Sequence, residues 1–165
     1  MTVRQILTWP DKRLRTRAAE VGDVSDEVRE IWRDMIDTMD AMPGVGLGAP
    51  QIGVMLRLAV VDTSEARNTR IRLANPEIID ASAIMNVHEE ASPCLSGVSA
   101  KISRPRGVRV RFLDETGNLT ERDFVGLDAT SVQHQIDHLD GKLYVDRLSK
   151  VKRDMLLRRA RKMKG

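Results

Sequence analysis

The chain has 165 residues, of which 41% are hydrophobic, 31% charged and only 3% aromatic, and its formal net charge at pH 7 is +3. This length and composition predict a single domain over residues 1–165 with an aliphatic core and exclude a low-complexity or fibrous chain. The lone cysteine excludes an intramolecular disulfide, and no stretch approaches the roughly 20 apolar residues of a membrane span, so we expect a cytoplasmic protein.

In the first half of the chain, a helix is predicted to begin after Ser25 and to end at Pro43. A glycine-rich loop, GVGLGAPQIG, follows over residues 44–53. Short strand-like runs occupy residues 56–61, 71–74 and 108–113, and the last turns into residues 119–125 as a hairpin. Apolar positions of the helix recur at three- and four-residue spacing, at Val28, Ile31, Trp32, Met35, Met39 and Met42.

Two further helices are predicted near the C-terminus. One covers about residues 128–139 and stops at Gly141, and a basic one covers about residues 149–164. The buried stripe of the basic helix is expected to consist of Val151, Met155 and Leu156. Because the strands are grouped between helices instead of alternating with them, the fold class is α+β.

The first of these helices carries a histidine pair, His134 and His138. Residues four apart on a helix project from the same face, so both imidazoles can reach one metal ion. A pair of surface histidines without a ligand is the alternative interpretation. A nearby carboxylate such as Asp137 commonly orients a metal-bound imidazole.

Cys94 is the third candidate ligand. A lone cysteine is more often a small buried hydrophobe, but this one lies in a polar stretch, SPCLSG, at residues 92–97. Together with the two histidines it makes a set of three ligands, which leaves a coordination position for water, as in catalytic sites. We expect the third histidine, His88, on the surface.

The glycine-rich loop lacks the Lys-Ser/Thr that follows a phosphate-binding loop, and no strand–turn–helix pattern surrounds it. Its glycines more plausibly let the backbone of a ligand approach closely. Gln51, at the end of the loop, is a candidate amide donor. The alternative is that its side chain caps backbone groups of the loop.

Three ordered motifs resemble those of the peptide deformylase family. That family reads G-x-G-x-A-A-P-Q, E-G-C-x-S and Q-H-E-x-D-H, and this chain reads GVGLGAPQ, SPCLS and QHQIDH at residues 44–51, 92–96 and 133–138. The opening stretch ILTWPDKRLR is also similar. The resemblance implies a compact α+β domain with antiparallel strands around a central metal-binding helix and a C-terminal helix.

The resemblance also implies metal-assisted removal of the formyl group from N-formylmethionyl peptides. One divalent ion, Fe²⁺ with Zn²⁺, Ni²⁺ or Co²⁺ as substitutes, would be bound by Cys94, His134 and His138. The developing oxyanion would meet the side-chain amide of Gln51 and the backbone N–H of Leu95. The loop residues Gly44, Val45 and Gly46 would pair with the peptide as a strand.

Departures from the family pattern lie at reactive positions. Gln135 replaces the glutamate that carries the proton, so a loss of about 10²–10⁴ in rate is expected. Ser92 and Pro93 replace Glu-Gly, and the fixed φ of proline is expected to reshape the loop that presents Cys94. Ser131 puts a hydroxyl near the methionine pocket. Other carboxylates that could substitute as the base are Glu89, Glu90 and Asp140.

Two alternatives to a slowed, monomeric hydrolase stay open. The first is a protein that keeps the fold and binds metal or peptide but has lost catalysis. The second is a ribosome- or RNA-associated module, based on the basic C-terminal helix. That helix contains eight cationic side chains, Lys150, Lys152, Arg153, Arg158, Arg159, Arg161, Lys162 and Lys164.

Overall fold

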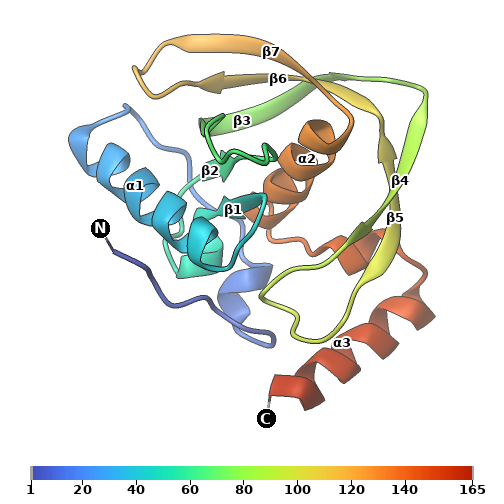
Figure 1. Ribbon diagram of the computed structural model, residues 1–165. Helices are drawn as coiled ribbons and strands as arrows, with labels where there is room; N and C mark the ends of the chain where they lie inside the picture. Colours follow the sequence, from blue (N-terminus) through green and yellow to red (C-terminus); the bar gives the residue numbers. More distant parts are fainter. Residues whose placement is uncertain (1, 165) are drawn as a thin grey trace.

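A computed structural model describes residues 2–164 and confirms the α+β fold. Two antiparallel sheets flank helix α2 (Leu127–Leu139), which lies between the β1–β2 end of the larger sheet and the β4–β5 ribbon (Figure 1). The larger sheet has the order β1-β2-β3-β6-β7, with bounds Gly46–Gly48, Leu58–Val61, Ile71–Ala81, Gly107–Leu113 and Leu119–Val125. The ribbon pairs β4 (Met85–Glu90) with β5 (Ala100–Pro105).

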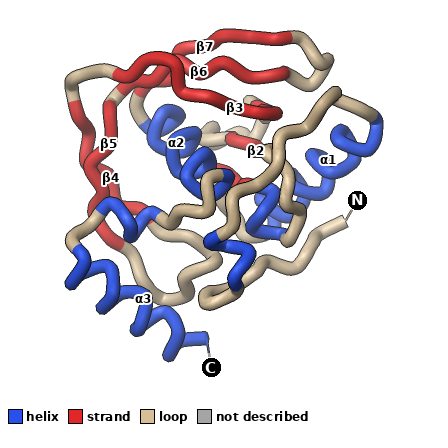
Figure 2. Tube along the Cα trace, turned by 180° about the vertical axis from the view of Figure 1, so that it is seen from behind, coloured by secondary structure: helices blue, strands red, loops and turns tan. Residues whose placement is uncertain are grey.

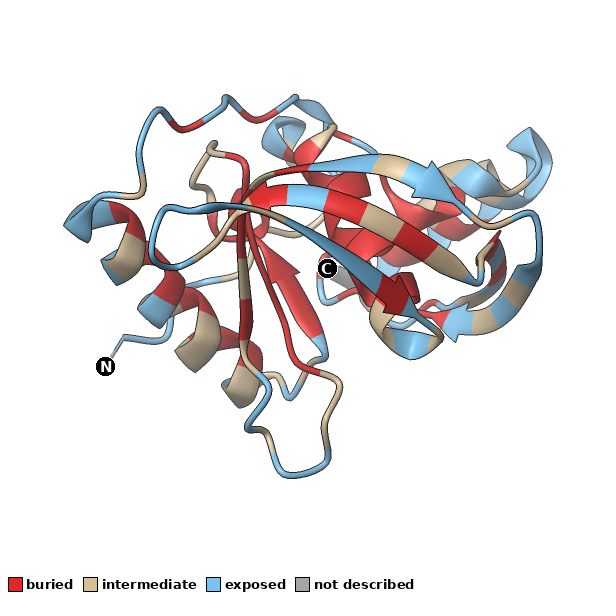
Figure 3. Cartoon of the chain, turned by 90° about the horizontal axis from the view of Figure 1, so that it is seen from above, coloured by how far each residue is buried: buried red, intermediate tan, exposed pale blue. Residues whose placement is uncertain are grey.

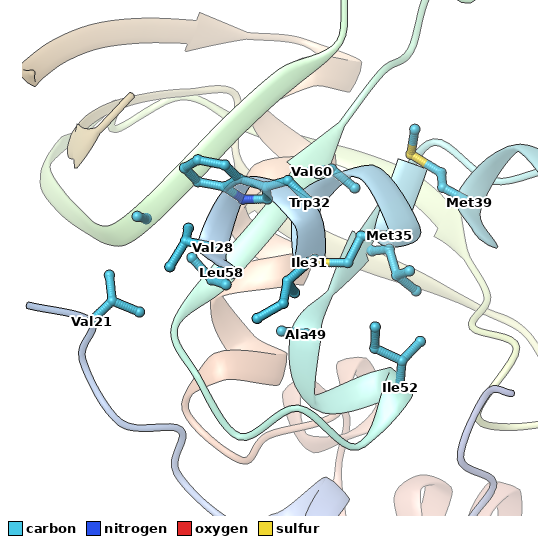
Figure 4. Packing of buried hydrophobic residues seen from close by; sticks show 12 residues of the cluster. Val21, Val28, Ile31, Trp32, Met35, Met39, Ala49, Ile52, Leu58 and Val60 are labelled. Carbon is cyan, nitrogen blue, oxygen red and sulfur yellow. The ribbon is translucent and has the colours of Figure 1, made fainter. Parts of the chain in front are cut away.

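The first predicted helix is confirmed as α1 (Asp26–Ala41). Ser25 caps it, because its side-chain oxygen accepts a hydrogen bond from the backbone N–H of Val28 at 3.2 Å. The apolar face packs on β1, β2 and the short helix η2 (Ala49–Ile52), with Trp32 and Met35 fully buried (Figure 4). Met42, beyond the end of α1, is only partly buried against this cluster.

Two further apolar clusters position α2. Ala129, Val132, Ile136 and Leu139 of α2 pack on the larger sheet. A third cluster joins Cys94 and Leu95 to Leu14 of η1 (Lys12–Arg15), to η3 (Tyr144–Arg147) and to α3 (Lys150–Lys164). Buried residues therefore gather where the sheets meet the helices, and exposed residues lie on the outer faces and loops (Figure 3).

The hairpin and the histidine helix were predicted close to their observed bounds. β6 and β7 pair from Gly107↔Val125 to Leu113↔Leu119, and Gly141 follows α2 with a φ of 74°. The β4–β5 ribbon was not predicted. Its sequences MNVHEE and AKISRP carry polar residues on both faces, so the period-two pattern is weak.

The predicted buried stripe of the last helix is partly wrong. Val151 is 79% exposed and Met155 44% exposed, whereas Leu156 and Ala160 are buried. Residues four apart share one helix face, so Leu156 and Ala160 form the contact of α3 with the third cluster. Viewed from behind, α3 lies at the edge of the molecule, away from the larger sheet (Figure 2). None of the helices within residues 2–164 is long and apolar enough to cross a membrane.

Candidate active site

Helix α2 is almost entirely buried although eight of its thirteen side chains are polar. Every residue from Ala129 to Leu139 is buried. Buried polar groups normally have hydrogen-bond partners, as Gln133 has in the carbonyls of Ala129 and Pro105. Gln135 Oε1 and both ring nitrogens of His138 are buried without one. These unpartnered atoms are the groups of α2 that are available to bind a ligand.

His134 is held by contacts on two sides. Its Nδ1 lies 2.8 Å from Glu90 Oε1, and its ring stacks on Tyr144 with centroids 5.7 Å apart. With Nδ1 donating to the carboxylate, Nε2 is the nitrogen that carries a free lone pair. The ring centre of His138 lies 5.0 Å away. The structure thus brings the two predicted histidines together.

His138 is electrostatically suited to be a neutral ligand. Burial, reinforced by the neighbouring His134, holds the pKa of His138 well below its usual value. The imidazole is therefore unprotonated at neutral pH, and its nitrogens are available to a cation.

A buried charge network anchors the histidine helix to the ribbon. Arg104 of β5 donates to both carboxylate oxygens of Glu90, at 2.7 and 2.9 Å, and to Asp137 at 2.9 Å. Arg147 adds two hydrogen bonds to Asp137. Burial alone would raise the pKa of both carboxyls. Hydrogen bonds from His134 and Arg104 nevertheless hold the pKa of Glu90 below its usual range, and hydrogen bonds from Arg147 and Arg104 do the same for Asp137. Glu90 is therefore an ionised partner of Arg104 and His134.

Cys94 lies at a β-turn built by its neighbours. The backbone N–H of Leu95 donates to the carbonyl of Ser92 at 3.0 Å, with Pro93 at the second position, where its fixed φ suits such a turn. The Cys94 thiol is buried, and its sulfur lies 3.5 Å from Gln51 Nε2. Burial raises the pKa of this thiol, so the protonated form is favoured.

Two of the three predicted metal ligands, His134 and His138, lie next to each other. Within residues 2–164, no group of three or more His, Cys, Asp and Glu side chains is arranged to bind a metal ion. The two imidazoles fit such an ion, because they are adjacent and the nitrogens of His138 are unpartnered. Cys94 as the third ligand stays a prediction, and we derive no reaction step through a metal.

A cleft of about 780 Å³ opens beside α2. Its walls are the β1 end of the larger sheet, the end of β4 and the loop after it, and its floor is α2. Cys94 and His138 do not line it and lie behind its surface. The predicted site residues that do line it are Gly44, Val45, Gly46, Gln51, Leu95, Ser131, His134 and Gln135.

The glycine at position 46 is required by the approach of α2. A Cβ added there would lie 2.5 Å from Gln135 Nε2 and 2.6 Å from Ser131 Oγ. The sequence predicts that such glycines admit the backbone of a ligand, whereas here helix α2 itself makes the close contact. Ser131 Oγ also donates to the carbonyl of Val45 at 3.0 Å, so its hydroxyl is satisfied by the loop.

Gln51 has a fixed orientation in the cleft wall. Its Oε1 accepts a hydrogen bond from the backbone N–H of Gly48 at 2.8 Å, which directs Nε2 toward Ser92 and Cys94. The capping interpretation therefore describes the amide oxygen of Gln51. The role of its amide nitrogen as a donor to a ligand stays a prediction.

Several residues of the site were missed or misassigned. Arg104 and Tyr144 carry no motif, although Arg104 shares its strand face with the buried Ile102, a signal that alternation could have given. Glu90 was considered only as a base. His88 was expected on the surface, but it is half-buried, with Nδ1 2.9 Å from Thr130 Oγ1 of α2.

Fold and site together define an α+β protein with a peptide-sized cleft beside a histidine pair. Comparison with known proteins agrees: the polypeptide deformylase family model matches residues 3–154, and the chain belongs to this family. It is 43% identical to the peptide deformylase of Rhodopseudomonas palustris (strain BisB5), with 98% of this chain and 95% of that protein covered.

Solved structures give the same result. A peptide deformylase from Legionella pneumophila is similar with a TM-score of 0.92 and 40% identity, covering 99% of this chain and 96% of that one. The enzyme from Ehrlichia chaffeensis in complex with actinonin has a TM-score of 0.93 and 35% identity, covering 99% and 98%. The family implies a metal-dependent hydrolase.

Proposed function

We propose that this protein binds N-formylmethionyl peptides in the cleft beside α2 and removes the formyl group slowly. The observation that carries the proposal is the position of Gln135, which lines the cleft next to His134 with a buried, unpartnered Oε1. The family relationship supports amide hydrolysis as the reaction. The unpartnered amide oxygen supports a ligand that brings a hydrogen-bond donor.

Two free strand edges suit an extended peptide. β1 is an edge strand, and the bond from the N–H of Asp62 to the carbonyl of Val45 makes that pair hydrogen-bonded. The next residue, Gly46, therefore directs its N–H and carbonyl away from β2. On the opposite wall, β4 pairs only with β5 among the described strands, and its end at Glu89 and Glu90 lines the cleft. A peptide between these edges can add as a strand.

The rate is low because Gln135 has no ionisable group. Its amide can accept a hydrogen bond from water or from a peptide N–H, but it cannot take the proton of water or return it to the amine. General acid–base help is worth about 10²–10⁴ in rate. Glu90 does not substitute, because its two oxygens are engaged by Arg104 and His134.

The proposed cofactor is one divalent ion, Fe²⁺ by analogy with the family and replaceable by Zn²⁺, Ni²⁺ or Co²⁺. His134, His138 and Cys94 would hold it, with thiolate and imidazole suiting these metals. When bound, it supplies the Lewis acidity that makes water a nucleophile at neutral pH. Gln51 would contribute its Nε2 donor to the formyl oxygen.

An anaerobic assay on iron-loaded protein tests this function. We expect turnover of a formyl-methionyl peptide about 10²–10⁴-fold below that of the Legionella relative under the same conditions. Peptide affinity is measured in parallel by calorimetry with the formylated and the unformylated peptide. Turnover equal to the relative's would contradict the proposed role of Gln135, and no binding of either peptide would contradict the cleft.

A second candidate is a binding protein without catalysis. The bond from the N–H of Leu95 to Ser92 favours it, because that N–H is then not free to stabilise an oxyanion. Tight binding of the formylated peptide with no product after many hours would select this candidate over slow hydrolysis.

Docking to the ribosome or RNA stays a prediction for α3. Exposed cations of this helix include Arg158, Arg159, Arg161 and Lys162, and Arg153 pairs with its neighbour Asp154. Such an electrostatic contact weakens steeply with salt. Ribosome pelleting at rising salt tests it, with a Cys94→Ser variant as the control that should bind equally.

A further inference from the structure

The carboxylate that contacts His134 lies outside the three motifs. The family pattern has its glutamate at position 92, where this chain has serine. Ser92 Oγ lies 3.5 Å from Gln51 Nε2 and accepts a hydrogen bond from the Cys94 N–H at 3.3 Å. The carboxylate next to His134 belongs to Glu90, the last residue of β4, whose Oε1 lies 2.8 Å from Nδ1. A residue that no motif marks therefore contacts a motif histidine.

Glu90 is itself held in place by a buried arginine. Arg104 donates to both of its carboxylate oxygens, and the same guanidinium donates to Asp137. Asp137 and His134 both belong to α2, so these bonds form a closed ring that begins and ends on one helix. The side chains of Arg104 and Glu90 are only 1% and 5% exposed, and water therefore weakens their hydrogen bonds little.

The contact fixes which nitrogen of His134 carries a proton. An ionised carboxylate accepts hydrogen bonds but cannot donate them, so Nδ1 must be the donor. In the neutral ring, Nε2 then has the free lone pair. Stacking on Tyr144, with an angle of 21° between the rings, holds the imidazole from a second direction. The tautomer and the plane of the ring are thus set by the protein alone.

We propose that Glu90 is a positioning residue that makes Nε2 of His134 the nitrogen available to a divalent cation, with Arg104 holding the carboxylate in place. The inference rests on the proposed metal-dependent function. Carboxylates that accept from a metal-binding histidine fix its tautomer and orientation and strengthen metal binding. Glu90 therefore acts through His134 and not as a base.

Nitrogen-15 NMR of the metal-free protein tests the tautomer without any need for activity. We expect a proton on Nδ1 of His134 in the wild-type protein. Glu90→Gln keeps the size of the side chain but introduces an amide that can also donate, so a share of His134 should change to the tautomer protonated on Nε2. Zn²⁺ affinity, measured by competition with a chelator, should fall about 10- to 100-fold. Circular dichroism checks that the variant is folded.

Glu89→Gln is the matched control. It removes the same charge one residue earlier, where the side chain points to the other face of β4 and accepts from Ser99 Oγ at 2.7 Å. The tautomer of His134 and the Zn²⁺ affinity should stay unchanged in this variant. An equal loss of affinity in both variants would assign the effect to net charge and overturn the role of Glu90. Unchanged tautomer and affinity in a folded Glu90→Gln variant would overturn it as well.

The wild-type spectrum separates this inference from the proposed function. A proton on Nδ1 of His134 in a protein that binds Zn²⁺ but never deformylates a peptide would support the positioning role and contradict the hydrolysis. A proton on Nε2 alone in an active protein would contradict the positioning role and leave the hydrolysis standing.

Discussion

Helix α2 carries one motif of the family and the loop at residues 92–97 carries another, but the two regions depart from the family pattern in different ways. In α2 the histidines keep their spacing and meet, held by Glu90, Arg104 and the sheet. In the loop, a proline turn replaces the family's Glu-Gly and engages the N–H of Leu95. A buried helix fixes its side chains through many contacts, whereas a loop follows its local backbone chemistry. A substitution in the loop therefore changes the local backbone more readily than a substitution in α2 does.

The largest expected change in deformylation rate comes from a substitution at the centre of α2. Gln135→Glu restores an ionisable group next to His134, and if the residue is the only defect, deformylation should rise about 10²-fold or more in steady-state kinetics. Gln135→Ala, which also removes the amide, should give no gain.

Replacing the buried Arg104 should weaken the link between α2 and the β4–β5 ribbon. Arg104→Met leaves Glu90 and Asp137 as buried carboxylates with fewer partners, which is expected to lower the free energy of unfolding by about 3–5 kcal/mol. Urea denaturation measures it. Arg109→Met, at an exposed pair on β6, should change stability much less.

The same network predicts acid sensitivity. Because the pKa values of Glu90 and Asp137 are lowered in the folded state, their contribution to stability is present above their unfolded values of 4.5 and 3.8 and is lost as pH falls below them. Thermal midpoints should therefore drop as the pH falls below these values, and less so in Arg104→Met. An equal drop in both proteins would exclude the network as the cause.

The smallest expected effect is at the contact between α2 and the glycine-rich loop. Ser131→Ala removes one hydrogen bond to Val45, whose carbonyl still accepts from the N–H of Asp62. The expected loss is about 1 kcal/mol in urea denaturation. Ser99→Ala, at an exposed site, serves as the control and should be close to neutral.

The sequence by itself determined much of this protein. Periodicity and caps predicted α1, the β6–β7 hairpin and α2, because those signals are local and repeat along the chain. The three motifs named the family, and the spacing of His134 and His138 predicted their meeting. The missing base at Gln135 is also visible in the sequence alone.

Only the tertiary structure decided the remaining features. The partners of buried polar groups come from distant segments, so no local pattern shows that Arg104 links Glu90 to Asp137 or that Ser131 contacts Val45. The β4–β5 ribbon escaped prediction because its faces are mixed in polarity. The arrangement of Cys94 depends on how the turn at Pro93 packs against Gln51 and Trp9. Such contacts arise when the chain closes on itself, because burial then requires each polar group to find a partner.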